Sequence, residues 1–150
     1  MRSVILIAIT IFFCGCATIP PMTQTEIKAF ETRRVDAGFD DVFAAGTEAL
    51  LDLGYSVSHS DKASGILAGE RAEDKEGADM KRIAMMIGGT QYSESDLRRS
   101  VQLTLYMRRD GDGTKVRIKT AYNNAPILDK KRIDEVWLYI ERQVLMESGD

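Results

Sequence analysis

The spacing of apolar residues predicts a regular succession of helices and strands along most of the chain. A helix over residues 37–53 follows from apolar side chains at helical spacing, with Asp36 as the expected N-cap and Gly54 after its last turn. Gly46 lies on the apolar stripe of this helix, where it permits close packing against a sheet. A second long helix is expected after its N-cap Asp129, and its buried face is formed by Ile133, Val136, Trp137, Ile140 and Val144.

Alternation of apolar and polar residues predicts the strands. The clearest strand covers residues 100–108, and the turn signal Asp110-Gly111-Asp112-Gly113 leads from it into a returning strand over residues 114–122. Shorter strands are expected over residues 30–35, 55–60 and 66–71. These hairpin signals imply an antiparallel sheet, and the one-sided alternation implies that one face of the sheet is buried and the other is solvated.

The sequence therefore predicts a two-layer α+β sandwich. It has an antiparallel sheet of about five strands, two main helices on one face, and a short helix inserted at residues 80–87. Residues 72–79 and 90–96 are expected to be irregular segments on either side of this insert. Met80 and Met86 are expected to pack within it.

The N-terminal segment has a different pattern. Arg2 precedes an apolar run over residues 4–13, which is shorter than the ~20 residues that cross a bilayer and has the length of a signal-peptide core. It leads into Phe13-Cys14-Gly15-Cys16, which resembles the bacterial lipoprotein box, in which a small residue precedes a cysteine that is lipidated and becomes the new N-terminus. Phe13 departs from the pattern, since an aliphatic residue is usual at that position.

We therefore expect three segments: a lipoprotein signal peptide over residues 1–15, a lipidated N-terminus and tether over 16–28, and a single α+β domain over 29–150. The resemblance to Gram-negative lipoproteins, with Ala17 after Cys16, implies a lipid anchor on Cys16 at the periplasmic face of the outer membrane. An ordinary secretory signal and an uncleaved N-terminal anchor are the alternatives.

Part of the body also resembles known proteins. Residues 50–55, Leu-Leu-Asp-Leu-Gly-Tyr, followed by Asp61-Lys62 and Gly65-Ile66, resemble a pattern in small, largely uncharacterised bacterial lipoproteins. The layout is similar in topology to the helix-grip domains of a lipoprotein component of the outer-membrane β-barrel assembly machine. These resemblances imply a two-layer α+β domain in the envelope, but no particular activity, because a fold does not determine a function.

Composition narrows the chemistry of the body. Its sequence lacks cysteine after Cys16 and has one histidine, His59, which excludes a disulfide framework, a Cys/His zinc site and a Cys–His nucleophile there. The chain has 20 basic and 23 acidic side chains and a formal net charge of −3, which is not typical of a general nucleic-acid binder. We expect no cofactor, no metal site, no catalytic residue and therefore no enzymatic activity.

Basic residues gather on one predicted hairpin. Between Arg98 and Lys119 the chain has seven basic and two acidic side chains. Alternation places a candidate binding surface for anionic lipid headgroups, glycan or an acidic protein on one outward face, formed by Tyr106, Arg108, Lys115, Arg117 and Lys119. Alternatively, such charges keep an open sheet soluble and discourage pairing between sheets.

Together these patterns predict a lipid-anchored envelope protein with a non-enzymatic binding, accessory or scaffold role at the outer membrane. Its expected contacts are the membrane, through Cys16, and an envelope protein partner. Two alternatives remain open. One is a binder of small ligands that uses a cavity between helices and sheet, and the other is a hydrolase of envelope material that uses Asp, Glu, Tyr or His59 chemistry.

Overall fold

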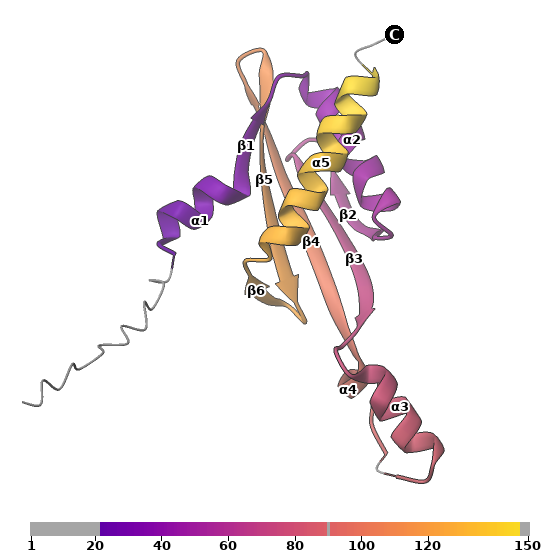
Figure 1. The fold of residues 1–150 in the computed structure, drawn as a ribbon. Helices are drawn as coiled ribbons and strands as arrows, with labels where there is room; N and C mark the ends of the chain where they lie inside the picture. Colours follow the sequence, from indigo (N-terminus) through magenta and orange to yellow (C-terminus); the bar gives the residue numbers. More distant parts are fainter. Residues whose placement is uncertain (1–21, 90, 148–150) are drawn as a thin grey trace, which may run out of the picture.

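The computed structural model describes residues 22–89 and 91–147, which form an antiparallel six-stranded sheet with two long helices on one face (Figure 1). The elements follow one another as α1 (Gln24–Glu31), β1 (Thr32–Val35), α2 (Phe39–Asp52), β2 (Ser56–Asp61), β3 (Ile66–Asp74), α3 (Ala78–Met86), α4 (Glu94–Leu97), β4 (Arg98–Asp110), β5 (Gly113–Tyr122), β6 (Ala125–Ile127) and α5 (Lys130–Glu147). The strand order is β1-β5-β4-β3-β2, and β6 also pairs with β5. The predicted α+β class is confirmed.

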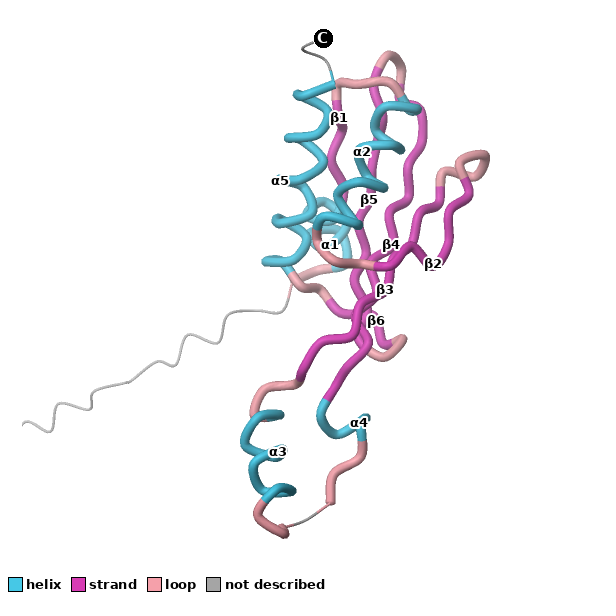
Figure 2. The backbone as a smooth tube through the Cα atoms, turned by 90° about the vertical axis from the view of Figure 1, so that its right-hand side faces the viewer, coloured by secondary structure: helices cyan, strands magenta, loops and turns pink. Residues whose placement is uncertain are grey.

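α2 and α5 pack against each other and cover the same face of the sheet (Figure 2). The core lies between these two layers. Its largest fully buried side chains come from both helices and the central strands: Trp137, Leu50, Leu67, Leu103, Leu105, Ile118, Ile133 and Ile140. Full burial of each leucine or isoleucine contributes about 1.5–3 kcal/mol, so this interface supplies most of the driving force for folding. These side chains fill the space between the helices and the sheet, where the small-ligand alternative requires a cavity.

The close packing predicted at Gly46 is confirmed. A Cβ atom at this position would lie 2.7 Å from Cε of Met107 and 3.3 Å from Cδ2 of Leu105, both on the sheet. The absence of a side chain at Gly46 therefore leaves room for the Met107 and Leu105 side chains where α2 lies against the sheet.

The ends of α2 agree only in part with the prediction. The helix begins at Phe39 with Gly38 at its N-cap, so Asp36 is not the cap. Asp36 instead forms an ion pair with Arg34. At the other end, Gly54 has a φ of +76°, the left-handed conformation expected of a glycine after a helix.

α1 is a helix that the sequence interpretation missed. Thr23 accepts a hydrogen bond from the backbone N–H of Glu26, and the Glu26 side chain accepts one from the Thr23 N–H at 2.7 Å. This reciprocal pair is a capping box. Residues 24–28 are therefore helical where a tether was expected, and β1 begins at Thr32 where residue 30 was expected. α1 stands at the β1 edge of the sheet (Figure 1).

Strands β3 and β6 both contain residues that were not predicted to lie in a strand. β3 continues to Asp74, through residues expected to be irregular, and its ladder with β4 includes the pair Glu73 and Arg99. β6 was not expected at all. Asn123 and Asn124 have φ values of 48° and 66° and form the two-residue turn that folds β6 back on β5.

β2 is an exposed strand at one edge of the sheet. Its register with β3 shifts between Val57 and His59, which marks a β-bulge. A bulge in an edge strand twists it and discourages pairing with another sheet. His59 is exposed on this strand.

The insert between β3 and β4 projects from one end of the sheet (Figure 1). Large apolar side chains of this insert are 51–87% exposed: Met80, Ile83, Met86 and Ile87. The expected packing of Met80 and Met86 within the insert was wrong. The side of α3 turned toward the rest of the insert carries Ala78, which is buried, and Met85, whose sulfur accepts a hydrogen bond from the Tyr92 N–H at 3.4 Å.

We predict that Gly65→Ala will destabilise the protein by about 3 kcal/mol in urea unfolding. Gly65 has a φ of +70°, and an added Cβ would overlap the carbonyl oxygen of Met107. The Gly65 carbonyl also accepts a hydrogen bond from the Met107 N–H at 2.7 Å, which holds the two backbones together.

Gly111→Ala is the matched control. Gly111 has a similar φ of +67°, but no described atom lies within 4 Å of its added Cβ. Its loss should be about 1 kcal/mol, the cost of the backbone conformation alone. Equal losses at the two positions would contradict the close contact between Gly65 and Met107.

Candidate functional site

The face of the sheet that α2 and α5 leave open carries a groove with basic walls. A hollow of about 300 Å³ lies between Tyr106 and the turn that joins β2 to β3. A second hollow of about 790 Å³ lies between α1 and the neighbouring strands. Both are lined by Thr32, Arg108, Lys115 and Arg117, so they are continuous. We call this the basic groove, defined by Lys28, Thr32, Arg34, Tyr106, Arg108, Lys115 and Arg117.

Strand register brings these side chains together. Arg108 on β4 pairs with Lys115 on β5, and Lys115 pairs with Arg34 on β1. Three cations therefore lie in one row across three strands. In the next row of the same face, Tyr106 pairs with Arg117. Like charges directly opposite each other weaken a sheet by roughly 0.2–1 kcal/mol per pair, so this row keeps positive charge at a cost in stability.

Two arginines of the groove are neutralised within the fold. Arg117 donates from Nε and Nη2 to Oε2 of Glu31 at 2.9 and 2.7 Å, and the Glu31 side chain is only 10% exposed. Arg34 pairs with Asp36 and Asp112. The guanidinium of Arg117 thus fastens α1 to β5, so it is less available to a ligand than its strand position indicated.

Four other cations in or beside the groove are unpaired. Lys28, Arg108, Lys115 and Lys119 form no ion pair or hydrogen bond within residues 22–89 and 91–147. The first three line the basic groove, and Lys119 lines a neighbouring hollow of about 220 Å³ beside α1. Tyr106 is 43% exposed. Four of the five residues of the predicted surface therefore line one groove, and the fifth, Lys119, lies next to it.

Sequence reasoning missed Lys28 and Arg34 as members of this site. The predicted tether includes Lys28, and the predicted strand that contains Arg34 has no predicted neighbour. The signal for α1 was present in the spacing of Thr23 and Glu26, because a threonine followed three residues later by a glutamate favours a helix start.

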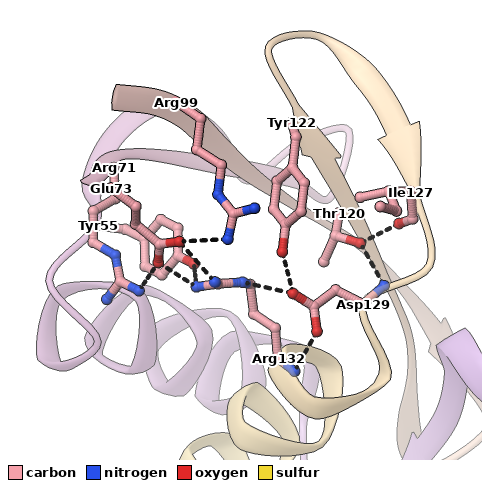
Figure 3. Close-up of polar contacts among 9 residues, drawn as sticks. All are labelled: Tyr55, Arg71, Glu73, Arg99, Thr120, Tyr122, Ile127, Asp129 and Arg132. Carbon is pink, nitrogen blue, oxygen red and sulfur yellow. Dashed lines mark hydrogen bonds and ion pairs between the residues drawn. The ribbon is translucent and has the colours of Figure 1, made fainter. Parts of the chain in front are cut away.

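A second cluster of charged side chains lies beneath the first turn of α5, on the covered side of the sheet (Figure 3). Arg132 is its centre. It donates hydrogen bonds to the Tyr55 hydroxyl at 2.7 Å, to Asp129 at 3.2 Å and to Glu73 at 3.0 Å. Asp129 also accepts a hydrogen bond from the Arg132 N–H at 3.1 Å, which confirms it as the predicted cap of α5.

Two further arginines complete this cluster. Arg71 and Arg99 both pair with Glu73, and each also lies over an aromatic ring. The guanidinium carbon of Arg71 is 4.7 Å from the centre of the Tyr55 ring, and that of Arg99 is 4.1 Å from the centre of the Tyr122 ring. The cluster thereby connects β3, β4 and β5 with the start of α5.

The electrostatics of the cluster favour anchoring over proton transfer. Burial opposes ionisation of Glu73, but hydrogen bonds from Arg71 and Arg132 outweigh it and hold the pKa of this carboxyl below its usual range. Burial also opposes ionisation of Asp129, and hydrogen bonds from Tyr122 and Arg132 again leave its pKa lowered. Both carboxylates stay charged at neutral pH, whereas a general acid needs a raised pKa.

The described part of the chain contains no group of three or more His, Cys, Asp or Glu side chains arranged to hold a metal ion. None of its helices is both long enough and apolar enough to cross a membrane. Cys14 and Cys16 lie outside the described residues.

No protein-family model and no curated protein matches the chain. Among solved structures it is similar to the crystal structure of TTHA0849 from Thermus thermophilus. The match has 12% sequence identity and a TM-score of 0.41, and it covers 78% of this chain and 96% of that one. A likeness of this size carries no argument about function.

We predict that Glu73→Gln will destabilise the protein by about 2–4 kcal/mol at pH 7, because it removes the carboxylate that three arginines share. The lowered pKa of Glu73 means that its contribution is complete above about pH 5 and is lost as the pH falls through the folded-state value. Urea unfolding from pH 7 to pH 3 should therefore show the gap between wild type and Glu73→Gln becoming smaller.

Glu76→Gln provides the control, since Glu76 is exposed just beyond β3. It should change stability by less than about 0.5 kcal/mol at either pH. A gap between wild type and Glu73→Gln that stays constant with pH would show that the charge of Glu73 does not hold the cluster together.

Proposed function

We propose that this chain is a lipid-anchored protein of the cell envelope that uses the basic groove to bind an anionic partner, without catalysing a reaction. The observation that carries the proposal is the set of unpaired cations Lys28, Arg108 and Lys115 around one hollow. Cations without internal partners attract anionic groups and raise their local concentration. The adjacent ring of Tyr106 adds an exposed aromatic surface suited to binding.

The lipid anchor rests on the resemblance of residues 13–16 to the lipoprotein box. Each acyl chain buries roughly 0.8 kcal/mol per methylene, and two or three chains together anchor a protein stably. α1 begins at Gln24, eight residues after Cys16. A fully extended connection of that length spans at most about 28 Å, so an anchor on Cys16 would hold α1 and Lys28 near the lipid headgroups.

The proposed partner is a component of the cell envelope at the periplasmic face of the outer membrane. Its anionic groups would be those of lipid, glycan or an acidic envelope protein. Because Arg117 is tied to Glu31, the binding contacts are assigned to Lys28, Arg108 and Lys115. The role is one of attachment or scaffolding, in which the groove fixes where on the envelope the domain sits.

We expect Cys16→Ser to abolish membrane anchoring, because serine cannot accept the thioether-linked lipid. In membrane flotation the wild-type protein should float with the outer-membrane fraction, and globomycin should block its processing. Cys14→Ser is the control and should float like wild type. If Cys16→Ser were processed and floated like wild type, the anchor would be refuted.

Crosslinking in intact cells tests the binding role. A photoreactive amino acid in place of Tyr106 should crosslink to an envelope component, and Arg108→Glu with Lys115→Glu should reduce the yield by about tenfold. The control position is Leu138, which is 64% exposed on the outer side of α5. Equal crosslinking from both positions, or no effect of charge reversal, would argue against the groove as the binding site.

A further inference from the structure

The cations of the basic groove converge on a hollow from three different elements. Lys28 comes from α1, Arg108 from β4 and Lys115 from β5, and all three line the same 790 Å³ space. The acidic side chains nearby do not neutralise them. Glu31 is bound to Arg117, and Asp36 and Asp112 are bound to Arg34. Asp110 also lines the hollow, and its carboxylate lies 3.9 Å from Arg34.

A concave site of this kind suits a compact anion. Arg108 and Lys115 are direct neighbours across β4 and β5, so each raises the electrostatic energy of the other. An anion between them removes this repulsion and forms charge-assisted hydrogen bonds with both. Phosphate, with several oxygen acceptors around one centre, can contact cations that approach from different sides.

The 300 Å³ hollow of the groove shares Arg108, Lys115 and Arg117 with the larger one. It adds Tyr106 and the turn at Ser64 and Gly65. The ring of Tyr106 pairs an apolar face with a polar hydroxyl, as is common for tyrosine side chains at membrane–water interfaces. This end of the groove therefore suits an uncharged group attached to the phosphate.

We infer that the basic groove binds the phosphate groups of anionic membrane lipids, with the uncharged part of the headgroup against Tyr106. This inference rests on the proposed function and names its partner. It favours lipid over an acidic protein because the site is a hollow and because the anchor on Cys16 would keep it within reach of headgroups. A short tether gives an effective concentration in the millimolar range, which fills even a weak site.

The first test uses inorganic pyrophosphate and the full chain carrying Cys16→Ser. Saturating pyrophosphate should raise the thermal unfolding midpoint by about 3–5 °C above sodium chloride of equal ionic strength. Lys115→Gln should raise the midpoint without ligand, because it removes the repulsion with Arg108, and should at least halve the response to pyrophosphate.

Lys131→Gln is the matched control, since Lys131 is exposed on α5 away from the groove. It should leave the response to pyrophosphate unchanged. If pyrophosphate gives no rise beyond that of sodium chloride, or if Lys131→Gln lowers the rise as much as Lys115→Gln does, the phosphate site is overturned.

The second test identifies the source of the phosphate by co-sedimentation with vesicles of phosphatidylglycerol or phosphatidylcholine. Arg108→Gln with Lys115→Gln should weaken binding to phosphatidylglycerol by about 25-fold, or about fivefold for each cation, and leave binding to phosphatidylcholine unchanged. All variants share the same N-terminal segment, so differences among them report the groove.

Two results would overturn the lipid assignment. If pyrophosphate binds but phosphatidylglycerol binding does not depend on the groove, the ligand is a soluble phosphate compound. If polyglutamate at equal charge raises the midpoint more than pyrophosphate does, the partner is an acidic protein. Flotation of Cys16→Ser is independent of both measurements, so failure of the anchor and failure of the phosphate site are distinguishable.

Discussion

The antiparallel ladder between β4 and β5 links the core of this protein to its open face. Leu103 and Leu105 on β4 are fully buried beneath the helices, and the residues between and beyond them point the other way. A slip of one residue would turn the buried leucines outward and Tyr106 and Arg108 inward. Burial of apolar area thus fixes the register, and the register in turn places Arg108 opposite Lys115 on the solvated side.

The two sides of the sheet differ in how their charged side chains are paired. Beneath α5, Glu73 and Asp129 are each bound by arginine, and this network joins the first turn of the helix to three strands. Such pairing offsets the cost of removing charged groups from water. On the open side, Arg108 and Lys115 have no such partners within the described part of the chain. Paired charges hold the fold together, and unpaired ones remain available to a ligand.

Sequence reasoning succeeded where apolar periodicity was uninterrupted. It predicted the two long helices, the β4–β5 hairpin, the close approach at Gly46 and the outward position of Tyr106. It missed α1 because an eight-residue helix with few buried side chains gives a weak periodic signal.

Sequence reasoning also missed the arginine cluster. Arg71 and Glu73 both lie at inward positions of β3, but Glu73 belongs to the charged stretch 72–79, which the sequence predicts to be irregular. These charges are neutralised by pairing between segments that are distant in the sequence. The sequence of one strand alone therefore does not reveal the cluster. The same limit applies to Lys28, which reaches the groove through the tertiary position of α1, and to Arg34, which reaches it through the pairing of β1 with β5.

Chemical-shift mapping can show residue by residue whether anionic lipid binds in the basic groove. The ¹⁵N-labelled full chain carrying Cys16→Ser would be titrated with nanodiscs of phosphatidylglycerol. If the groove binds lipid phosphate, saturable changes should be concentrated at Lys28, Tyr106, Arg108 and Lys115, with little change at Lys131. Changes spread evenly over the surface, or concentrated on the exposed apolar side of α3, would contradict it.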